Sequence, residues 1–371
     1  MSTSTSRFAL KITPSSARVD AGIRERMLAD PGFGRIFTEH MVRIMWDDKA
    51  GWHSGELTPF APLSLSPGTQ VLHYAQAVFE GLKAFRQADG SVAAFRPDAH
   101  AARFQRSARR LALPELPVST FIESIETLLE VDHDWVPTAA DHSLYLRPFM
   151  FGSDAGLGVH PAHQVTFLLI ASPSGSYFPN GVNPVTVWLS EDFSRAAPGG
   201  TGAVKTGGNY AGGLLAQAQA AEKGCDQVVW LDSREHRFVE EMGGMNLFFV
   251  FGSGANAKLM TPELTGTLLA GITRDALLQL GSDLGYTVEE GRISTSDWQA
   301  GCADGSLTEA FACGTAAVIT PVGSVKSSHG DWTVSGGRPG QVTMRLRQAL
   351  VDIQRGAAPD PHGWMRRLFP R

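Results

Sequence analysis

The chain carries a glycine-rich loop with a single lysine, the most informative candidate for chemistry in the sequence. Residues 198–210 read PGGTGAVKTGGNY, and the lysine is Lys205. A lysine on an exposed helix stays protonated, whereas one shielded from bulk water loses its proton more readily and can attack an aldehyde to form an imine. The loop therefore indicates a covalent lysine or, taken alone, a solvated lysine on a surface loop.

The same loop has a competing interpretation as a phosphate-binding loop. Such a loop needs the pattern G-x-x-x-x-G-K-[ST], together with a buried strand that ends in a magnesium-binding aspartate. The run 228–232 ends in Asp232, but the residue before Lys205 is Val204 rather than glycine. A P-loop nucleotide-binding protein is therefore the remote alternative.

Two further segments carry residues suited to a binding site. Glu240 and Glu241 are adjacent at the end of a strand-like segment, where alternation sends side chains to opposite faces, so one of them is expected to enter a site. Taken alone, the pair is more typical of a solvated strand end. Residues 271–273 (GIT) precede a helix, whose N-terminus offers free amides and a positive dipole end to a phosphate.

The elements that would position these residues alternate between strands and helices, which predicts an α/β (α+β) fold. Strands are expected at 43–47, around Leu57, and at 92–96, 143–151, 165–172, 185–190, 227–232, 246–251 and within 309–325. Helices are expected at 98–112, 118–136, 209–223, 272–285 and 341–355. The Pro-, Gly- and Ser-rich stretch 173–184 predicts a linker between a smaller domain, 1–178, and a larger lysine-bearing domain, 179–371, with a small-molecule site in the cleft.

Composition excludes several classes of protein. The 371 residues, with 43% apolar and 19% charged side chains, are typical of a folded chain of two to three domains. Lys plus Arg is 32 and Asp plus Glu is 37, so a net charge of -5 argues against a nucleic-acid partner. The three cysteines form no CxxC pair, which predicts no metal site. We expect a cytoplasmic protein without a membrane span, because the N-terminus lacks an apolar signal core and every apolar run is short.

Seven ordered blocks resemble the branched-chain-amino-acid aminotransferases, which are fold type IV enzymes that use pyridoxal 5'-phosphate (PLP). They lie on both sides of the lysine loop, and the likeness extends over most of the chain. The blocks are HYAQAVFEGLKAFR (73–86), FRPDAHAARF (95–104), YLRPFMFG (145–152), SYFPNG (176–181), EEMGGMNLFFV (240–250), GITR (271–274) and ACGTAAVITPVG (312–323). The resemblance implies a two-domain architecture with the site in the interdomain cleft, and a homodimer.

The resemblance assigns cofactor roles to seven residues. Lys205 matches the lysine that forms the imine with PLP and then carries the substrate α-proton. Tyr210 matches the tyrosine that hydrogen-bonds the O3′ atom of the cofactor, and Glu241 matches the glutamate that keeps its ring nitrogen protonated. The residues that match phosphate ligands are Arg103, Ile272, Thr273 and Thr315.

The resemblance also implies a substrate pocket. Four aromatic residues would wall an apolar cavity for the amino-acid side chain: Tyr74, Phe79, Tyr145 and Tyr177. Arg147 would meet the side-chain carboxylate of glutamate or position a pocket tyrosine, and turn amides near Gly244 and Ala316 would meet the α-carboxylate. Gly244 departs from the threonine of mammalian members, which removes a hydroxyl group from that turn.

These residues together predict a transaminase that moves the amino group of L-leucine, L-isoleucine or L-valine to 2-oxoglutarate, giving branched 2-oxo acids and L-glutamate. Within the same fold, a D-amino-acid transaminase or an aminodeoxychorismate-lyase-like enzyme is the alternative, because its lysine, glutamate and phosphate ligands would look alike.

Overall fold

The computed structural model describes residues 8–176 and 181–370, which form two compact units. Of these residues, unit 1 comprises 8–176, 205–207 and 353–370, and unit 2 comprises 181–204 and 208–352. The predicted boundary at residue 178 would let the chain pass from one domain to the other only once. In the structure the chain returns to unit 1 at Lys205 and again near its C-terminus. The first return follows from backbone pairing, because Phe79 N donates to Lys205 O at 3.0 Å.

Unit 1 is built on a nine-stranded, almost wholly antiparallel sheet. Along the sheet the strands are β1 (Lys11–Ile12), β3 (Gly51–Pro59), β2 (His40–Asp47), β8 (Gln164–Ser174), β7 (Ser143–Gly152), β5 (Leu82–Arg86), β6 (Val92–Phe95) and β18 (Met365–Phe369), and β4 (Ala77–Phe79) pairs with β7. The long β7–β8 pair at its centre carries buried side chains along nearly its whole length. The C-terminal strand β18 therefore completes a sheet that the N-terminal half begins.

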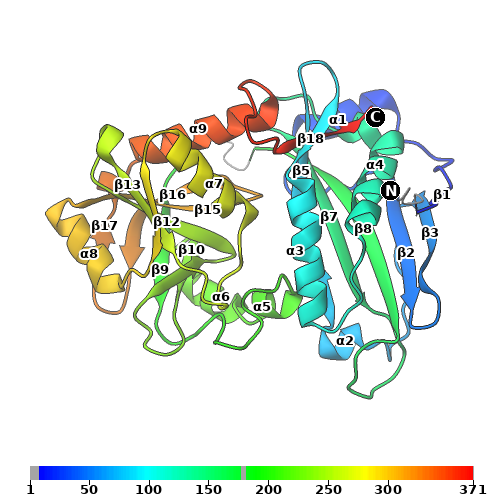
Figure 1. Cartoon of the computed structure of the whole chain (residues 1–371), viewed down its shortest axis with the longest axis horizontal. Helices are drawn as coiled ribbons and strands as arrows, with labels where there is room; N and C mark the ends of the chain where they lie inside the picture. The colour runs from blue at the N-terminus through cyan, green and yellow to red at the C-terminus, as the bar shows by residue number, and fades with distance from the viewer. Residues whose placement is uncertain (1–7, 177–180, 371) are drawn as a thin grey trace, which may run out of the picture. The chain divides into compact units, whose positions relative to one another are not determined.

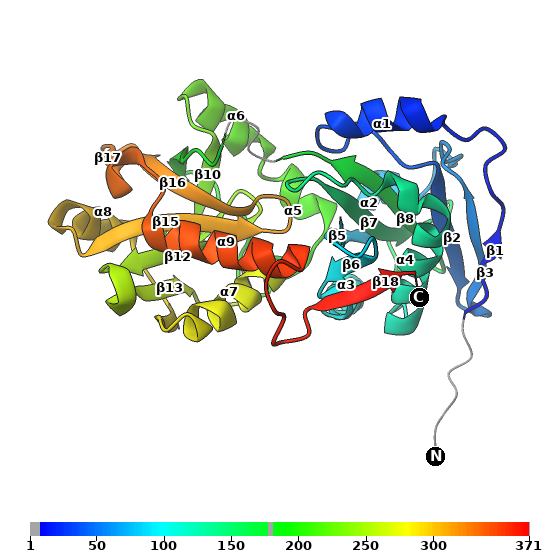
Figure 2. The same cartoon turned by 90° about the horizontal axis from the view of Figure 1, so that it is seen from above.

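The helices of unit 1 are α1 (Ala21–Ala29), α2 (Val71–Tyr74), α3 (Pro97–Arg110) and α4 (Val118–Asp132), followed by the 3-10 turn η1 (His133–Trp135). In Figure 2, α1 lies on one face of the sheet, and α3 and α4 lie on the other. Pro97 in the first turn, followed by Asp98, starts α3, which buries an apolar stripe that includes Phe104. The other arginines of this helix are exposed, but Arg103 is only 4% exposed.

Unit 2 is built on a second nine-stranded sheet. Its order is β11 (Val239–Met242), β10 (Gln227–Leu231), β9 (Val185–Ser190), β16 (Val318–Lys326), β15 (Leu307–Gly314), β12 (Met245–Phe251), β13 (Lys258–Pro262) and β14 (Thr287–Gly291), and β17 (Trp332–Thr333) pairs with β16. Because β11 also pairs with β12, the strands from β11 to β12 close into a ring. Buried Leu and Val side chains from these strands, with Phe249 and Trp298, form its core.

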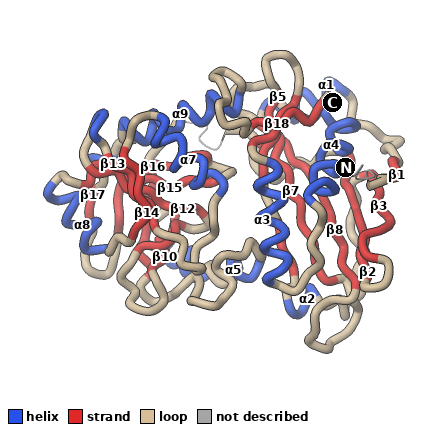
Figure 3. The backbone as a smooth tube through the Cα atoms, viewed as in Figure 1, coloured by secondary structure: helices blue, strands red, loops and turns tan. Residues whose placement is uncertain are grey.

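The helices of unit 2 lie around the outside of these strands (Figure 3). They are α5 (Gly207–Ala211, which starts in unit 1), α6 (Leu214–Glu222), α7 (Ile272–Asp283), α8 (Thr295–Asp304) and α9 (Gln341–Arg355, which ends in unit 1), with the 3-10 turns η2 (Gly254–Asn256) and η3 (Ser335–Gly337). The prediction of one continuous helix over 209–223 is wrong, because the helix is interrupted at Gly212 and Gly213. The backbone freedom of glycine makes a helix interior unfavourable at these two positions.

Most predicted strands and long helices are present within a few residues of their expected ends, as Figure 1 allows the reader to follow. The elements that sequence periodicity did not predict include α1, α8 and the strands β13, β14 and β18, which lack a strong apolar period. The capping box of Ser294 and Asp297 at the start of α8, with Gly305 in the left-handed conformation at its end, was a usable signal. In the described part of the chain, no helix has both the length and the apolarity needed to cross a bilayer.

Candidate active site

Lys205 is anchored to unit 1 by its own backbone. Its N–H donates to Ser107 Oγ on α3 at 3.1 Å, and its carbonyl accepts from Phe79 N at 3.0 Å. The next residue, Thr206, donates from Oγ1 to Ala77 O at 2.7 Å. The Lys205 Nζ atom lies 4.8 Å from the centre of the Phe79 ring. These contacts fix the main chain, so the position of the lysine does not depend on its side chain.

The environment of Lys205 lowers the pKa of its amine to about 8. Burial is the largest cause, followed by the positive charge of Arg103, while the carboxylate of Glu80 opposes the shift. An ordinary lysine is almost wholly protonated at neutral pH, and this amine has a reactive neutral fraction. The arrangement can therefore support nucleophilic attack on a carbonyl carbon.

A buried ion-pair network lies beside the lysine. Glu80, fully buried, accepts from Arg103 Nε at 2.7 Å and from Arg103 Nη2 at 2.9 Å, and its Oε2 lies 2.8 Å from His100 Nδ1. Burial raises the pKa of Glu80, but the Arg103 guanidinium outweighs burial and holds the pKa well below its usual range. Arg103 is thus held in one orientation by a bidentate contact.

Sequence reasoning named Arg103 but missed Glu80 and His100. A signal was present, because Glu80 is a charged residue inside the apolar run AVFEGLKAF of residues 77–85. A carboxylate in such a run must find a cationic partner if the run is buried. The identity of the partner depends on how α3 packs on β4 and β5, which no local pattern gives.

The structure brings together three of the predicted substrate residues. Arg147 Nη2 donates to Tyr145 Oη at 3.1 Å, and the Arg147 guanidinium carbon lies 4.8 Å from the Phe79 ring centre. Gly81 is necessary beside them, because a Cβ atom there would lie 1.9 Å from Tyr145 Oη. A cavity of about 220 Å³ adjoins Tyr145 and Arg147 and is also lined by Phe33, which sequence reasoning missed.

Another predicted substrate residue, Tyr74, bonds to a different segment of unit 1. Tyr74 ends α2 and is 42% exposed, and its hydroxyl donates to Leu157 O at 2.5 Å. Tyr177 lies outside the described residues. Gly244 and Ala316 belong to unit 2, in the β11–β12 and β15–β16 turns.

Glu241 is a buried carboxylate of unit 2 with partners at both oxygens. It is 1% exposed, and its Oε2 forms an ion pair with Arg195 Nε at 2.9 Å. Its Oε1 accepts from Leu269 N at 2.7 Å and from Asn246 Nδ2 at 3.3 Å. Sequence reasoning found Glu241 but missed Arg195 and Asn246, because both contacts depend on tertiary packing. An ionised carboxylate fixed in this way can hold a proton on a basic ring nitrogen.

The remaining predicted ligands of unit 2 lie on segments that meet at Asn246. In the sheet, Asn246 is paired with Glu241 on β11 and with Cys313 on β15, two residues before Thr315. Its side chain also approaches Gly271, where a Cβ atom would lie 2.0 Å from Asn246 Oδ1. Gly271 is the N-cap residue of α7, whose first residues are the buried Ile272 and Thr273.

Tyr210 lies next to the β11–β12 turn of unit 2. A Cβ atom on Gly244 would lie 3.1 Å from Cε1 of Tyr210, so the tyrosine ring packs directly on that turn. A threonine at this position would have to displace the ring by a few tenths of an ångström. The glycine that departs from the mammalian pattern is thus matched to the position of Tyr210.

The burial of Glu240 contradicts the prediction, made from the pair alone, of a solvated strand end. The glutamate pair was more typical of a solvated strand end, but Glu240 is 6% exposed and Glu241 1% exposed. Glu240 Oε1 accepts from Thr267 Oγ1, and burial raises the pKa of Glu240. The two side chains have different partners, as strand alternation predicts.

Asp232 does not have the surroundings of a magnesium ligand. Its two carboxylate oxygens accept four backbone N–H groups, from residues 234, 235, 237 and 238, at 2.8 to 3.2 Å. Although burial raises the pKa of Asp232, these bonds outweigh it and lower the pKa to about 2. The residue closes the turn between β10 and β11, which leaves the nucleotide-binding alternative without its aspartate.

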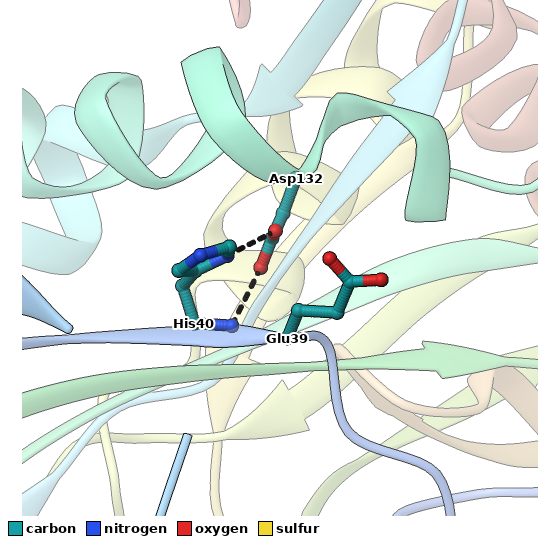
Figure 4. Close-up of side chains that lie close together, drawn as sticks. All are labelled: Glu39, His40 and Asp132. Atoms are coloured by element: carbon teal, nitrogen blue, oxygen red, sulfur yellow. Dashed lines mark hydrogen bonds and ion pairs between the residues drawn. The ribbon is translucent and has the colours of Figure 1, made fainter. Parts of the chain in front are cut away.

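Glu39, His40 and Asp132 form a cluster whose potential ligand atoms lie within 4.8 Å of one another (Figure 4). His40 Nδ1 lies 2.6 Å from Asp132 Oδ1, and Asp132 Oδ2 accepts from His40 N at 3.0 Å. His40 Nε2 accepts from Ser15 N at 2.8 Å, and Glu39 pairs with Arg18. Because both ring nitrogens are engaged within the chain, the cluster is suited to tethering the N-terminal segment rather than to holding a metal ion.

The model of the family described as amino-transferase class IV matches residues 77–325, about two thirds of the chain. The chain belongs to the class IV aminotransferases. This class IV aminotransferase is 59% identical over 360 residues to a probable branched-chain-amino-acid aminotransferase of Streptomyces coelicolor, an alignment that covers 97% of this chain and 98% of the relative. It is 60% identical over 347 residues to the branched-chain-amino-acid aminotransferase of Mycolicibacterium smegmatis, covering 93% and 94%.

Solved structures give the same family. The branched-chain amino acid aminotransferase of Escherichia coli superposes with a TM-score of 0.73 and 29% identity, over 88% of this chain and 99% of that chain. A second branched-chain amino acid aminotransferase, solved with pyridoxamine 5'-phosphate, superposes with a TM-score of 0.71 and 28% identity, over 88% and 98%. The predicted family and the α/β fold of fold type IV are confirmed for this class IV aminotransferase.

Proposed function

We propose that this class IV aminotransferase uses PLP to move the amino group of L-leucine, L-isoleucine or L-valine to 2-oxoglutarate. The observation that carries the proposal is the amine of Lys205, whose pKa is lowered to about 8 beside a buried arginine. The relatives that are 59% and 60% identical to this chain bear the name of that activity. The assay below separates the predicted D-amino-acid transaminase alternative, and an aminodeoxychorismate-lyase-like enzyme would give no glutamate in it.

The donor set of the two units fits PLP. A reactive amine suits the aldehyde, a fixed carboxylate suits the ring nitrogen, and an oriented guanidinium with a helix N-terminus suits the phosphate. From the family resemblance, we assign the binding of the cofactor to Arg103, Lys205, Tyr210, Glu241, Ile272, Thr273 and Thr315.

When bound, the cofactor supplies an electron sink that makes the α-proton of the amino acid acidic. Lys205 then acts as the base, because a neutral amine is available to accept that proton and its main chain is fixed. Glu241 supplies a fixed negative charge, and Arg103 supplies a fixed positive one. Tyr210 provides a hydroxyl donor beside the turn that contains Gly244.

The substrate side chain is proposed to lie among Phe79, Tyr145 and Arg147. Two aromatic rings give an apolar surface for a branched alkyl group, and the guanidinium gives a partner for the side-chain carboxylate of glutamate. We retain Tyr74, Tyr177, Gly244 and Ala316 as predicted contacts of the same ligand. Both kinds of substrate would thereby use one cavity.

We also propose a cytoplasmic homodimer. Leu72 and Tyr74 on α2 lie beside the segment that carries Leu157 and Val159, and all four are exposed, Val159 by 81%. An apolar surface of this kind is typical of a contact between subunits. The three cysteines are free thiols, as expected in a reducing compartment.

A substrate panel tests the function. The PLP-loaded protein is assayed with 2-oxoglutarate and, separately, leucine, valine, D-alanine or aspartate, and the glutamate formed, of either configuration, is measured by chromatography. We expect turnover with leucine and valine and little with the other two. A preference for D-alanine would replace the proposal with the D-amino-acid alternative. If no donor gave glutamate, the proposal that the protein is a transaminase would be wrong.

The pKa of Lys205 predicts a pH dependence for cofactor capture. Because the pKa is lowered to about 8, the neutral amine becomes abundant about two units below the range of an ordinary lysine. The rate at which apoprotein develops the visible absorption band of bound PLP should therefore rise with pH, with a midpoint near 8. A midpoint near about 10 would mean that the amine is as basic as a solvated lysine.

A further inference from the structure

Arg195 is buried in unit 2 and makes directional contacts that the cofactor roles above do not use. Its side chain is 5% exposed, and Nε lies 2.9 Å from Glu241 Oε2. On its other side, Nη1 donates to Thr267 O at 2.8 Å and to Gly202 O at 3.3 Å. The guanidinium therefore connects the Glu241 carboxylate to two main-chain carbonyls.

The carbonyls that hold Arg195 are themselves closely packed. A Cβ atom on Gly202 would lie 2.3 Å from Thr267 O, so only glycine permits the two backbones to approach this closely. Thr267 is 3% exposed, and its hydroxyl donates to Glu240 Oε1. Glu240 thus fixes the residue whose carbonyl fixes Arg195.

The strand geometry explains how two adjacent glutamates both help to hold Arg195. Glu240 and Glu241 follow one another on β11, so their side chains leave opposite faces of the strand. Glu241 pairs directly with the Arg195 guanidinium, whereas Glu240 acts on it indirectly, through Thr267. The segment 267–269 contacts both glutamates, since Leu269 N also donates to Glu241 Oε1 at 2.7 Å.

We propose that Arg195 is a positioning residue, which stabilises the charge and orientation of Glu241 toward the ring nitrogen of the cofactor, and that Glu240 and Thr267 hold Arg195 in place. The inference rests on the proposed function, because it takes Glu241 as the partner of that nitrogen. A buried carboxylate that loses its cationic partner is poorly stabilised and gains a proton more easily. The ring nitrogen then loses the anion that keeps it protonated.

Arg195→Gln tests the proposal, since glutamine retains much of the side-chain volume but removes the charge. A positive charge on the ring nitrogen opposes protonation of the Lys205 nitrogen once it is bonded to the cofactor, so loss of that charge should raise the apparent pKa of the visible band by roughly one unit. The dissociation constant for PLP should rise by about 10- to 100-fold, as for a lost charged hydrogen bond. Both quantities are measured by absorption, without turnover.

Matched variants separate positioning from general destabilisation. Thr267→Val removes the hydroxyl with little change of shape and should shift the band in the same direction, whereas Thr267→Ser keeps the hydroxyl and should return the band toward that of the unmodified protein. Arg338→Gln is the control arginine, because Arg338 belongs to the same unit and its side chain is exposed. It should leave the band unchanged.

The outcomes decide the proposal. An unchanged band pKa and PLP affinity in Arg195→Gln, even with a lower melting temperature, would overturn it and leave Arg195 a purely structural residue. An equal shift in Arg338→Gln would also overturn it. A failure of the proposed function is distinguishable, because the unmodified protein would then form no PLP band to titrate.

Discussion

Replacing Lys205 with alanine is expected to abolish transamination and to leave the protein folded. The amine is the proposed base and the covalent anchor of the cofactor, so we expect a loss of at least about 10⁴-fold in turnover. The fold should persist because Lys205 is held by main-chain bonds, from its N–H to Ser107 Oγ and from Phe79 N to its carbonyl. Both bonds survive in Lys205→Ala. Glutamate formation from leucine measures the loss, and circular dichroism measures the fold.

Borohydride reduction provides the control. Reduction of the unmodified, PLP-loaded protein should fix the cofactor to the peptide that contains Lys205, and the alanine variant should carry no label there. Lys223→Ala is the matched control for loss of a lysine. The Nζ atom of Lys223 lies 4.4 Å from the centre of the Trp188 ring and has no proposed role in the reaction. Full activity of Lys205→Ala, or a label on another lysine, would remove the base from the proposed mechanism.

The parts of the site that the sequence predicted are those in which chemistry is local to the chain. The glycine-rich loop around Lys205, the acidic pair that contains Glu241 and the helix start at Ile272 are each readable within a few residues. Their helices and strands also follow from periodicity, apart from the break at Gly212 and Gly213. The family resemblance added Arg103, whose burial a helical period alone does not distinguish from that of its exposed neighbours.

The partners of these residues were not predictable, for a physical reason. Glu80 meets Arg103 across 23 positions, and Arg195 meets Glu241 across 46, so each pair depends on the packing of separate elements. Periodicity reports which side of an element is buried, not which charge lies opposite. A charge inside an apolar run shows that a partner must exist, and Glu80 was the residue for which that signal could have been read.

Replacing Glu80 with alanine is expected to destabilise unit 1 strongly. The carboxylate is fully buried and accepts both Arg103 Nε and Arg103 Nη2, so its removal leaves a buried guanidinium without that anion. Breaking such a pair by removing one partner costs about 3–5 kcal/mol. We expect a loss of this size in the free energy of unfolding, measured by urea titration of the PLP-free protein, and weaker PLP binding because Arg103 loses its orientation.

Two controls test whether the stability lost in Glu80→Ala comes from the buried ion pair: an exposed ion pair of another α3 arginine, and the pH dependence of the loss. Arg109 Nε, in the last turn of α3, lies 2.8 Å from Glu115 Oε1, but the two side chains are 67% and 37% exposed, so Glu115→Ala should change stability little. The pKa of Glu80 is depressed in the folded protein, so its stabilisation is present above its unfolded pKa of about 4.3 and is lost as the pH falls through the lower, folded value. The difference between Glu80→Ala and the unmodified protein should therefore be constant from about pH 6 to 8 and shrink below about pH 4. A loss no larger than that of Glu115→Ala would show that the buried network does not stabilise unit 1.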